Sequence, residues 1–394
     1  MARYAVYLER AEGGLCMAHV PALPGCMVRA TGRDEVLGAL PGAIRAYHAW
    51  LRDHGEAAPG EAEPVELEVA GEVEGTGPFN PGDAAALFPS DREAVTPEEM
   101  EAHFRLMAHA RADLLALAGG LCDEFLDWEP GGGCFTLRRI LRHVGNAEEW
   151  YVSRLMAPES LPTEWQDDEG MPLWDFLEME RRTALGCLRS LSAEERAGVF
   201  YPTAWTSHPD EAWTLRKVLR RFLEHEREHT AQVREVLELR RGAILADLHT
   251  ARQDLLAVLS DLDPSCPDPV CGEWALKDVL GHLADWEWFG IDGLRLMGRG
   301  EPPLVEPIED IDAWNRAHAA ARRGQPWEVA LADLHAAREA LLDALQALAP
   351  CFLGQKYPFP WGGEGTPVDW LAVYPAHDRE HAEELAALAG QRDG

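Results

Sequence analysis

The first 70 residues carry short apolar runs with the period of β-strands, interrupted by one stretch with the period of a helix. Gly13 and Gly14 separate the first two runs, and this loop has the composition of a hairpin connection. The last run, 65–69, alternates apolar residues with glutamates, as expected of an edge strand. The pattern predicts strands at 3–10, 15–20, 27–30 and 65–69 and a helix at 34–53.

A stretch rich in acidic residues, glycine and proline follows this module. No Lys or Arg lies between Arg52 and Arg92, whereas ten Asp and Glu residues accumulate there. Such composition is typical of a solvated spacer. We therefore predict an acidic linker over 71–95.

From Thr96 onward the apolar residues recur with helical spacing. Thr96, Pro97 and Glu99 form the pattern of a helix start, with a capping residue, a proline in the first turn and a capping box. Two antiparallel four-helix bundles are the economical assembly. Helices are predicted at 97–118, 136–156, 171–192 and 214–241, and then at 243–261, 274–298, 310–348 with a break near 324–326, and 366–389.

The fold expected is thus mainly α, with a small N-terminal α+β domain of ββαβ order before two tandem bundles. The predicted domains are 1–70, the linker 71–95, a first bundle over 96–241 and a second over 242–394.

The two bundles are copies of one pattern. Leu137 and His143 match Leu276 and His282, and the Tyr-Pro…Trp segment at 201–205 returns at 357–361. A threonine followed by two histidines also returns. These matched residues are Thr214, His225 and His229 in the first half and Thr366, His377 and His381 in the second.

Each half concentrates three histidines on faces that point into a bundle. Two histidines four apart on a helix project from the same side, one turn above the other. The third lies on the second helix of its bundle, among apolar residues. Three neutral imidazoles leave open coordination positions on a metal, as a catalytic site requires. The candidate metal ligands are His143, His225, His229, His282, His377 and His381.

Two other interpretations compete with this one. Core histidines that pair with each other or with the backbone would need no metal. The segment 225–229 also satisfies the H-E-x-x-H pattern of zinc metalloproteases, with Glu226 as general base. The second copy has Asp378 at that place, one methylene shorter.

Several neighbouring residues are candidates for supporting roles. Polar residues one turn or one residue from the ligands could orient them. These are Asn146, Asp285, Glu228 and Glu380. Aromatic residues on the loops that enter the last helix of each bundle could wall a substrate pocket. These are Tyr201, Trp205, Tyr357 and Trp361.

Charge and cysteine content narrow the class of protein. The 394-residue chain has a formal net charge of −32, which repels phosphate backbones and excludes nucleic acid as a partner. No apolar stretch is long enough to cross a bilayer, and no signal peptide precedes the first strand, so we expect a soluble cytoplasmic protein without a membrane partner. The eight cysteines fit reduced thiols, and Cys266 and Cys271 are the closest pair.

The first 70 residues resemble the HicB-like antitoxin domain. The resemblance rests on the opening strand 4–8, the glycine loop, the segment 21–26 and the helix that follows 32–35. Members often mask a small toxin ribonuclease, which implies a protein partner. The DNA-binding appendage common in that family has no counterpart here.

Residues 97–392 resemble the DinB superfamily of metal-binding four-helix bundles. The carriers are the histidine on the second helix and the H-x-x-x-H pair on the fourth, present in both halves. The resemblance implies a divalent transition metal such as zinc, nickel, manganese or iron, and a low-molecular-weight thiol as cosubstrate, because characterised members include thiol-dependent transferases and isomerases. It also implies a pseudo-dimer of the two bundles within one chain.

The favoured function is therefore a metal-dependent transferase or hydrolase that acts on a small-molecule substrate, with thiol conjugation as the leading case. The competing function is a binding or regulatory protein, in which the N-terminal module captures a partner and the bundles are metal-stabilised scaffold. A metal site that faces a pocket favours the enzyme, and a closed site favours the scaffold.

Overall fold

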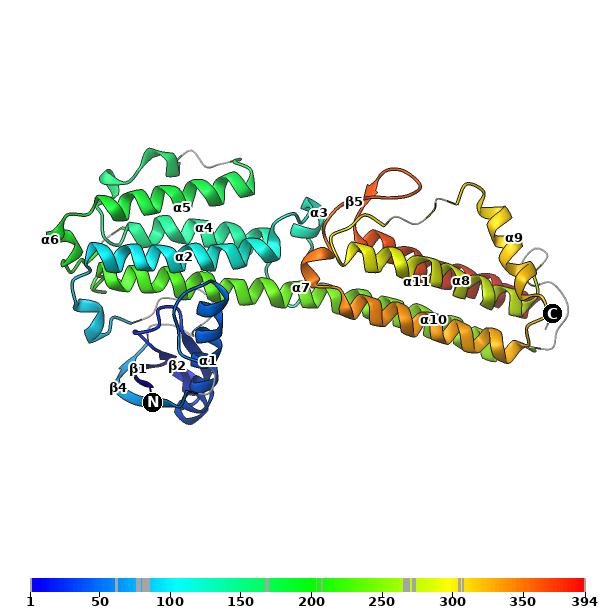
Figure 1. Ribbon diagram of the computed structural model, residues 1–394, viewed down its shortest axis with the longest axis horizontal. Helices are drawn as coiled ribbons and strands as arrows, with labels where there is room; N and C mark the ends of the chain where they lie inside the picture. The colour runs from blue at the N-terminus through cyan, green and yellow to red at the C-terminus, as the bar shows by residue number, and fades with distance from the viewer. Residues whose placement is uncertain are drawn as a thin grey trace. The chain divides into compact units, whose positions relative to one another are not determined.

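The computed structural model describes residues 2–60, 63–75, 79, 86–166, 170–202, 204–206, 208–264, 270, 274–303, 306 and 308–392. It is mainly helical with a small N-terminal sheet domain, as the sequence predicts (Figure 1). The chain divides into two compact units, one formed by Met1–Leu117 with Phe135–Val233 and the other by Ala118–Cys134 with Arg234–Gly394.

The N-terminal domain is built on one sheet of four strands. These are β1 (Ala2–Arg10), β2 (Leu15–His19), β3 (Met27–Thr31) and β4 (Val65–Glu74), arranged in the order β3-β2-β1-β4. β1 pairs antiparallel with β2 and parallel with β4. Three strands precede the helix, so the predicted ββαβ order was wrong by one strand, because the run at 27–30 pairs with β2.

Helix α1 (Arg33–Asp53) packs its apolar side on this sheet. Val36, Leu40 and Ile44 recur at helical spacing and are fully buried against the inward side chains of β1 and β2. Burying side chains of this kind contributes about 1.5–3 kcal/mol each. Pro41 lies inside the helix, which continues past it without a break.

Two parts of the predicted acidic linker are structured. β4 extends to Glu74, beyond the predicted end at residue 69. Phe88 is fully buried and stacks on Tyr7, with ring centroids 4.8 Å apart. The apolar surface of Tyr7 and Phe88 therefore outweighs the surrounding acidic composition, and this segment is not a solvated spacer throughout.

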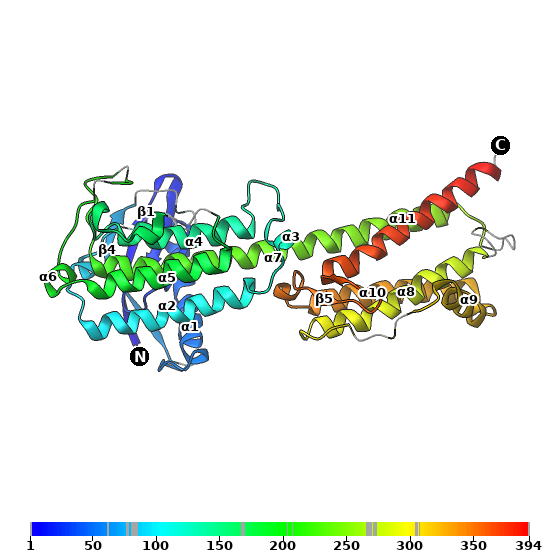
Figure 2. The ribbon, with the colours of Figure 1, turned by 90° about the horizontal axis from the view of Figure 1, so that it is seen from above.

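The remaining helices of the first unit lie side by side in both views (Figures 1 and 2). We call this set the first helical domain. It contains α2 (Pro97–Ala118), α4 (Leu137–Val152), α5 (Leu173–Ser190), the short α6 (Ala193–Arg196) and residues 215–233 of α7 (Leu215–Ser260). The capping box at the start of α2 is confirmed, because the Thr96 and Glu99 side chains each accept a hydrogen bond from the other's backbone N–H.

The second helical domain repeats this arrangement with different connections. It contains residues 234–260 of α7, α8 (Leu276–Met297), α9 (Ile311–Arg322), α10 (Trp327–Ala347) and α11 (Pro367–Arg392), with the short α3 (Asp123–Leu126) and the hairpin β5 (Tyr357–Pro358) and β6 (Glu364–Gly365). The predicted break near 324–326 is confirmed, since α9 ends at Arg322 and α10 starts at Trp327.

Helix α7 is one continuous helix of 46 residues, whereas the sequence predicted two helices that meet at Arg241 and Gly242. Glycine costs only about 1 kcal/mol in a helix interior, which tertiary contacts offset. Arg241 supplies such contacts, because its guanidinium donates to the carbonyl oxygens of Gln346 and Leu348 at 2.8 and 3.1 Å.

Among the described residues, none of the helices combines the length and the apolar character needed to cross a lipid bilayer. The described cysteines are free thiols. The pair Cys266 and Cys271 lies outside the described residues.

A buried ionic network joins the sheet domain to α7. His19 Nε2 lies 2.8 Å from Glu9 Oε2, and His19 Nδ1 lies 2.7 Å from Glu224 Oε1. Arg220 donates to Glu224 and to Asp91, at 3.0 and 2.8 Å. All five side chains are at most 4 % exposed. Carboxylates only accept hydrogen bonds, so both ring nitrogens of His19 must carry protons and the ring is an imidazolium.

The pKa values agree with this assignment. Burial opposes the charge on His19, but the two glutamates outweigh burial and raise its pKa above the ordinary 6.5. The His19 imidazolium in turn helps to hold the pKa of Glu9 below 4.5, against its own desolvation.

We expect His19→Gln to destabilise the protein by about 3–5 kcal/mol near pH 6, because it leaves two buried carboxylates without their cation. The loss should be largest between about pH 4.5 and 6.5. Above 6.5 the unfolded chain no longer holds the proton, so the contribution of His19 falls as the pH rises through its folded pKa. Below 4.5 the glutamates of the unfolded chain become protonated, so the contribution is lost as the pH falls through the lowered pKa values of Glu9 and Glu224 in the folded protein. Urea unfolding at several pH values measures this difference.

His335→Gln is the matched control, because His335 is an exposed histidine on α10. It should change the unfolding free energy by less than about 0.5 kcal/mol. Equal losses for both variants, or a His19 effect independent of pH, would contradict the imidazolium assignment.

Candidate metal centres

The first histidine cluster is assembled from α4 and α7. Thr136 caps α4 by accepting a hydrogen bond from the backbone N–H of Arg139, which fixes where the helix begins and hence the direction of His143 two turns later. His225 and His229 lie one turn apart on α7, as their spacing predicts. The structure brings these three residues together, as the sequence predicts.

The ring nitrogens of this cluster converge. His225 Nε2 lies 3.1 Å from His143 Nε2, and one donor nitrogen from each of the three rings lies within 4.8 Å of the others. His225 and His229 are each 3 % exposed, whereas His143 is an exposed residue. The cluster therefore sits at the edge of the domain rather than in a closed core.

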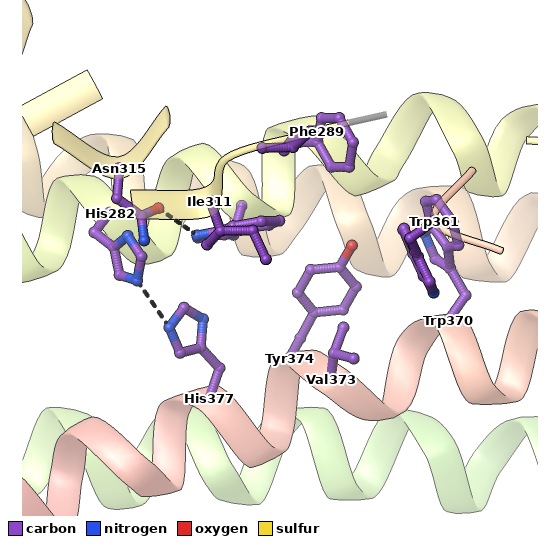
Figure 3. Close-up of a pocket in the computed structure, with 11 residues that line it drawn as sticks. His282, Phe289, Ile311, Asn315, Trp361, Trp370, Val373, Tyr374 and His377 are labelled. Atoms are coloured by element: carbon purple, nitrogen blue, oxygen red, sulfur yellow. Dashed lines mark hydrogen bonds between the residues drawn. The ribbon is translucent and has the colours of Figure 1, made fainter. Parts of the chain in front are cut away.

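The second cluster has the same composition on α8 and α11. His377 Nε2 lies 2.9 Å from His282 Nε2 and 3.1 Å from His381 Nε2 (Figure 3). His282 and His381 are buried and His377 is half-buried. The repeat noticed in the sequence is thus a repeat in three dimensions.

Four of these imidazoles are held in the neutral form. Burial and the neighbouring histidines lower the pKa of His282 to about 3. Burial likewise lowers the pKa values of His229 and His377 to about 4. Desolvation also drives the pKa of His225 well below 6.5. Neutral imidazole is the form that coordinates a metal.

The last histidine of each cluster is oriented by a residue three positions later on its own helix. His229 Nδ1 donates to Gln232 Oε1 at 2.7 Å, and His381 Nδ1 donates to Glu384 Oε2 at 2.9 Å. A proton fixed on Nδ1 leaves a lone pair on Nε2, aimed into the cluster. Sequence reasoning missed both partners, although their shared i, i+3 position in the two copies was a usable signal.

The residues predicted to orient the ligands do something else. Asp285 forms an ion pair with Arg322, with a 2.8 Å hydrogen bond. Glu228 is buried within 3.7 Å of Arg221. Asn146 and Glu380 are exposed. For Asp285 and Glu228, nearby arginines satisfy the carboxylates more strongly than a neutral imidazole would.

Next to the first cluster lies a buried group of two arginines and two carboxylates, one from each long helix of the domain. Arg181 donates to Glu148 at 2.9 Å and to Glu226 at 2.8 Å. Arg111 bonds the same two carboxylates. We call these four residues, Arg111, Glu148, Arg181 and Glu226, the first ion cluster.

The second ion cluster consists of Arg252, Glu287, Arg338 and Asp378 and repeats the first. Arg252 donates to Asp378 at 3.0 Å and to Glu287 at 2.6 Å, and Arg338 donates to Asp378 at 2.8 Å. One carboxylate follows a ligand histidine directly in each copy, and the other lies five residues after the histidine of the second helix.

The arginines also tie the helix backbones together. Arg111 donates to the carbonyl oxygen of Leu177, and its counterpart Arg252 donates to that of Leu334, at 3.0 and 3.1 Å. Arg181 donates in the same way to the carbonyl oxygen of Met107, and Arg338 donates to that of Leu248. Sequence reasoning missed both ion clusters, because their members lie far apart along the chain.

The geometry argues against Glu226 as the general base of a metalloprotease. Its carboxylate is buried and shared between Arg111 and Arg181, which hold its pKa below 4.5 against desolvation. A carboxylate anchored by two cations is a poor proton acceptor. The H-E-x-x-H spacing in this chain thus combines a ligand-like histidine pair with a structural carboxylate.

The residues present fit a divalent transition metal. Two nitrogens that each lie about 2.0–2.1 Å from one zinc ion cannot be more than about 4.2 Å apart, and the 2.9 and 3.1 Å separations meet this limit. His229 Nε2 is buried with no hydrogen-bond partner among the described residues. A bound metal ion would satisfy such a buried nitrogen.

A cavity adjoins the second cluster. It has a volume of about 530 Å³, and His282 and His377 form part of its wall (Figure 3). Of the loop aromatics singled out in the sequence, Trp361 lines this cavity. Tyr357 is buried and donates to the carbonyl oxygen of Met297, while Tyr201 and Trp205 are exposed.

Comparisons with known proteins give two relatives. A 57-residue stretch, 14 % of this chain, is 39 % identical to 83 % of a UPF0150 protein of Thermoplasma acidophilum. A 122-residue stretch, 31 % of this chain, is 22 % identical to 69 % of an Oceanobacillus iheyensis protein named "putative metal-dependent hydrolase". No solved structure matches the chain.

The family comparison covers most of both helical domains. The model of the DinB superfamily matches residues 106–233 and again residues 247–385. Both matches include the full set of three histidines and the four residues of the adjacent ion cluster. The protein therefore belongs to the DinB superfamily, with two tandem copies of the family domain.

Proposed function

We propose that the protein is a metal-dependent transferase or hydrolase, with a divalent transition metal held by His282, His377 and His381 and a second held by His143, His225 and His229. One observation carries the proposal: the converging nitrogens of His282 and His377 form part of the wall of a cavity large enough for a small molecule. A relative named as a metal-dependent hydrolase supports the same class.

Three groups of residues would contribute to the reaction: the histidines, the residues that position them, and Tyr374. His282 and His377 offer neutral nitrogen donors, because burial lowers their pKa values. Glu384 fixes the tautomer of His381, and the second ion cluster fixes the separation of the helices that carry the ligands. A metal bound there supplies Lewis acidity, which polarises an electrophile and makes water or a thiol nucleophilic at neutral pH. Tyr374 remains a protonated donor in the wall, because burial raises its pKa.

Thiol conjugation is the finer proposal, and it comes from the resemblance to thiol-dependent members of the superfamily. Hydrolysis needs only water in place of the thiol at the same centre. Both reactions bring a nucleophile to an electrophile held beside the histidines, so the site supports them equally and an assay must separate them.

The scaffold alternative applies best to the first helical domain. Between Val144, Tyr151, Phe222 and His225 the packing leaves no room for a water molecule. A metal held there would stabilise the domain to which the sheet module is bound. Capture of a protein partner by a HicB-like module stays a prediction, as do the four-helix bundle topology of each domain and a pseudo-two-fold packing of the two.

The purified protein should contain up to two transition-metal ions per chain, measured by elemental analysis. His377→Ala with His381→Ala should remove one ion, and His225→Ala with His229→Ala should remove the other. A chelator should lower the melting temperature, since a ligand at a hundredfold excess over Kd contributes about 2.7 kcal/mol.

The exposed His335→Ala serves as the control and should retain both ions. If the purified protein contains no stoichiometric metal and the chelator leaves its melting temperature unchanged, these are core histidines without a metal.

Catalysis should depend on the second cluster. With metal-loaded protein we expect turnover of either an activated ester in water or 1-chloro-2,4-dinitrobenzene with a low-molecular-weight thiol. The His377→Ala, His381→Ala variant should fall to the background rate, because it removes two of the three proposed ligands, and His377 borders the cavity. If the variant loses its metal but the metal-loaded wild type is inactive in both assays, the metal sites are supported and the enzymatic function is refuted.

Glu226→Gln should lower stability by about 3–5 kcal/mol, because the buried Arg111 and Arg181 lose half of their compensating charge. Its effect on turnover should be small. Asp378→Asn is the matched variant in the second ion cluster and should destabilise to a similar extent. If Glu226→Gln instead leaves stability unchanged and abolishes proteolysis, the metalloprotease interpretation would be supported.

A further inference from the structure

The cavity beside His282 and His377 has two chemically different ends. The histidine pair forms one end (Figure 3). At the other end Trp361 stacks on Trp370, with ring centroids 5.0 Å apart and planes inclined by 19°. Tyr374 lies between the two ends. A molecule that fills the cavity therefore touches the histidines with one part and indole rings with the other.

The walls offer ring surfaces rather than charge. Among the described residues that line the cavity there is no Asp, Glu, Lys or Arg. Trp286 donates its indole N–H to Asn315 Oδ1 at 3.1 Å, and Trp370 donates its own to the carbonyl oxygen of Gly290 at 3.0 Å. Both indole donors are thereby used within the protein. A charged molecule would lose its hydration without gaining partners along these walls.

Two glycines on α8 allow this wall to form. A Cβ at Gly290 would overlap the Tyr374 hydroxyl, and one at Gly293 would overlap the Trp370 ring. The rings of Trp370 and Tyr374 can therefore lie directly on the backbone of α8. Any larger residue at either position would push a ring of α11 out of its place in the wall.

The first helical domain has large residues where α8 has its glycines. Counted from the matched histidines, Tyr151 and Arg154 stand where α8 has its two glycines, and Val218 and Phe222 stand where α11 has Trp370 and Tyr374. The Tyr151 and Phe222 rings lie 5.4 Å apart in a packed interior. At one matched pair large and small have changed helices, since Arg154 and Val218 replace Gly293 and Trp370, and at the other Tyr151 adds a ring where the second copy has Gly290. In the second copy the aromatic rings of α11 line a cavity.

We propose that this cavity selects a substrate with a flat, uncharged aromatic body, bound against the aromatic rings of the wall, whose polar reacting group lies at His282 and His377. The fate of that reacting group rests on the proposed metal-dependent function. Binding of the aromatic body rests on the walls alone, so the two can be tested separately.

The test uses the full-length protein and two neutral probes, 2-naphthol and the saturated alcohol cyclohexanol. Calorimetric titration should show one 2-naphthol site per second helical domain, at least about tenfold tighter than cyclohexanol, because stacking on several rings adds to the burial of area. Removing the metal with a chelator should leave this binding in place.

Variants at exposed positions avoid disturbing the fold. Trp361→Ala should weaken 2-naphthol binding about three- to tenfold. Trp205→Ala, the matched loop position of the first copy with the same 58 % exposure, should not change it. Val373→Asp, which puts a carboxylate on the wall, should also weaken binding, whereas Val329→Asp on α10 should not.

Equal binding of the two probes, or equal losses for Trp361→Ala and Trp205→Ala, would overturn the aromatic selectivity even if both metals are present. Selective 2-naphthol binding by a protein that purifies without metal would support the cavity's selectivity and overturn the proposed catalytic function instead.

Discussion

The two buried ion clusters constrain everything else in the helical domains. Desolvating an arginine or a carboxylate costs several kcal/mol, so a cluster of two of each is tolerable only when all four meet with good geometry. In each domain the members come from four separate helices, and their arginines also bond opposite backbones. Helix spacing and rotation are thereby fixed. Because Glu226 and Asp378 directly follow His225 and His377, placing the carboxylates also places the ligand histidines.

Helix α7 combines several of these constraints in the first unit. One side carries His225 and His229, another carries Glu226 of the ion cluster, and a third presents Arg220 and Glu224 to the sheet domain. Glu226 on this helix is matched by Arg111 and Arg181, and Arg220 by Asp91, all from elsewhere in the chain. The sheet domain is accordingly joined to the helix that carries the candidate metal ligands, and the acid–base state of His19 is part of that junction.

The two copies share their buried polar groups and differ in the packing beside them. Both copies keep three histidines, an ion cluster and an i, i+3 partner for the last histidine. The space beside the histidines diverged, because large side chains in the first copy stand where the second copy has Gly290 and Gly293. Apolar packing accepts changes of side-chain size more readily than a buried charge cluster accepts the loss of a member. One ancestral arrangement can thus give packed rings beside the histidines in one copy and a substrate-sized cavity in the other.

Local sequence rules determined much of this protein. Helical periodicity placed His225 beside His229, the repeat identified His143 and His282 as the third donors, and the capping box at Thr96 marked the start of α2. Those features depend on residues within a turn of each other or on a match between copies. The role of Glu226 depended on arginines 115 and 45 positions away. Likewise, the continuity of α7 through Gly242 and the cavity between α8 and α11 follow from packing between distant segments, which only the tertiary structure decides.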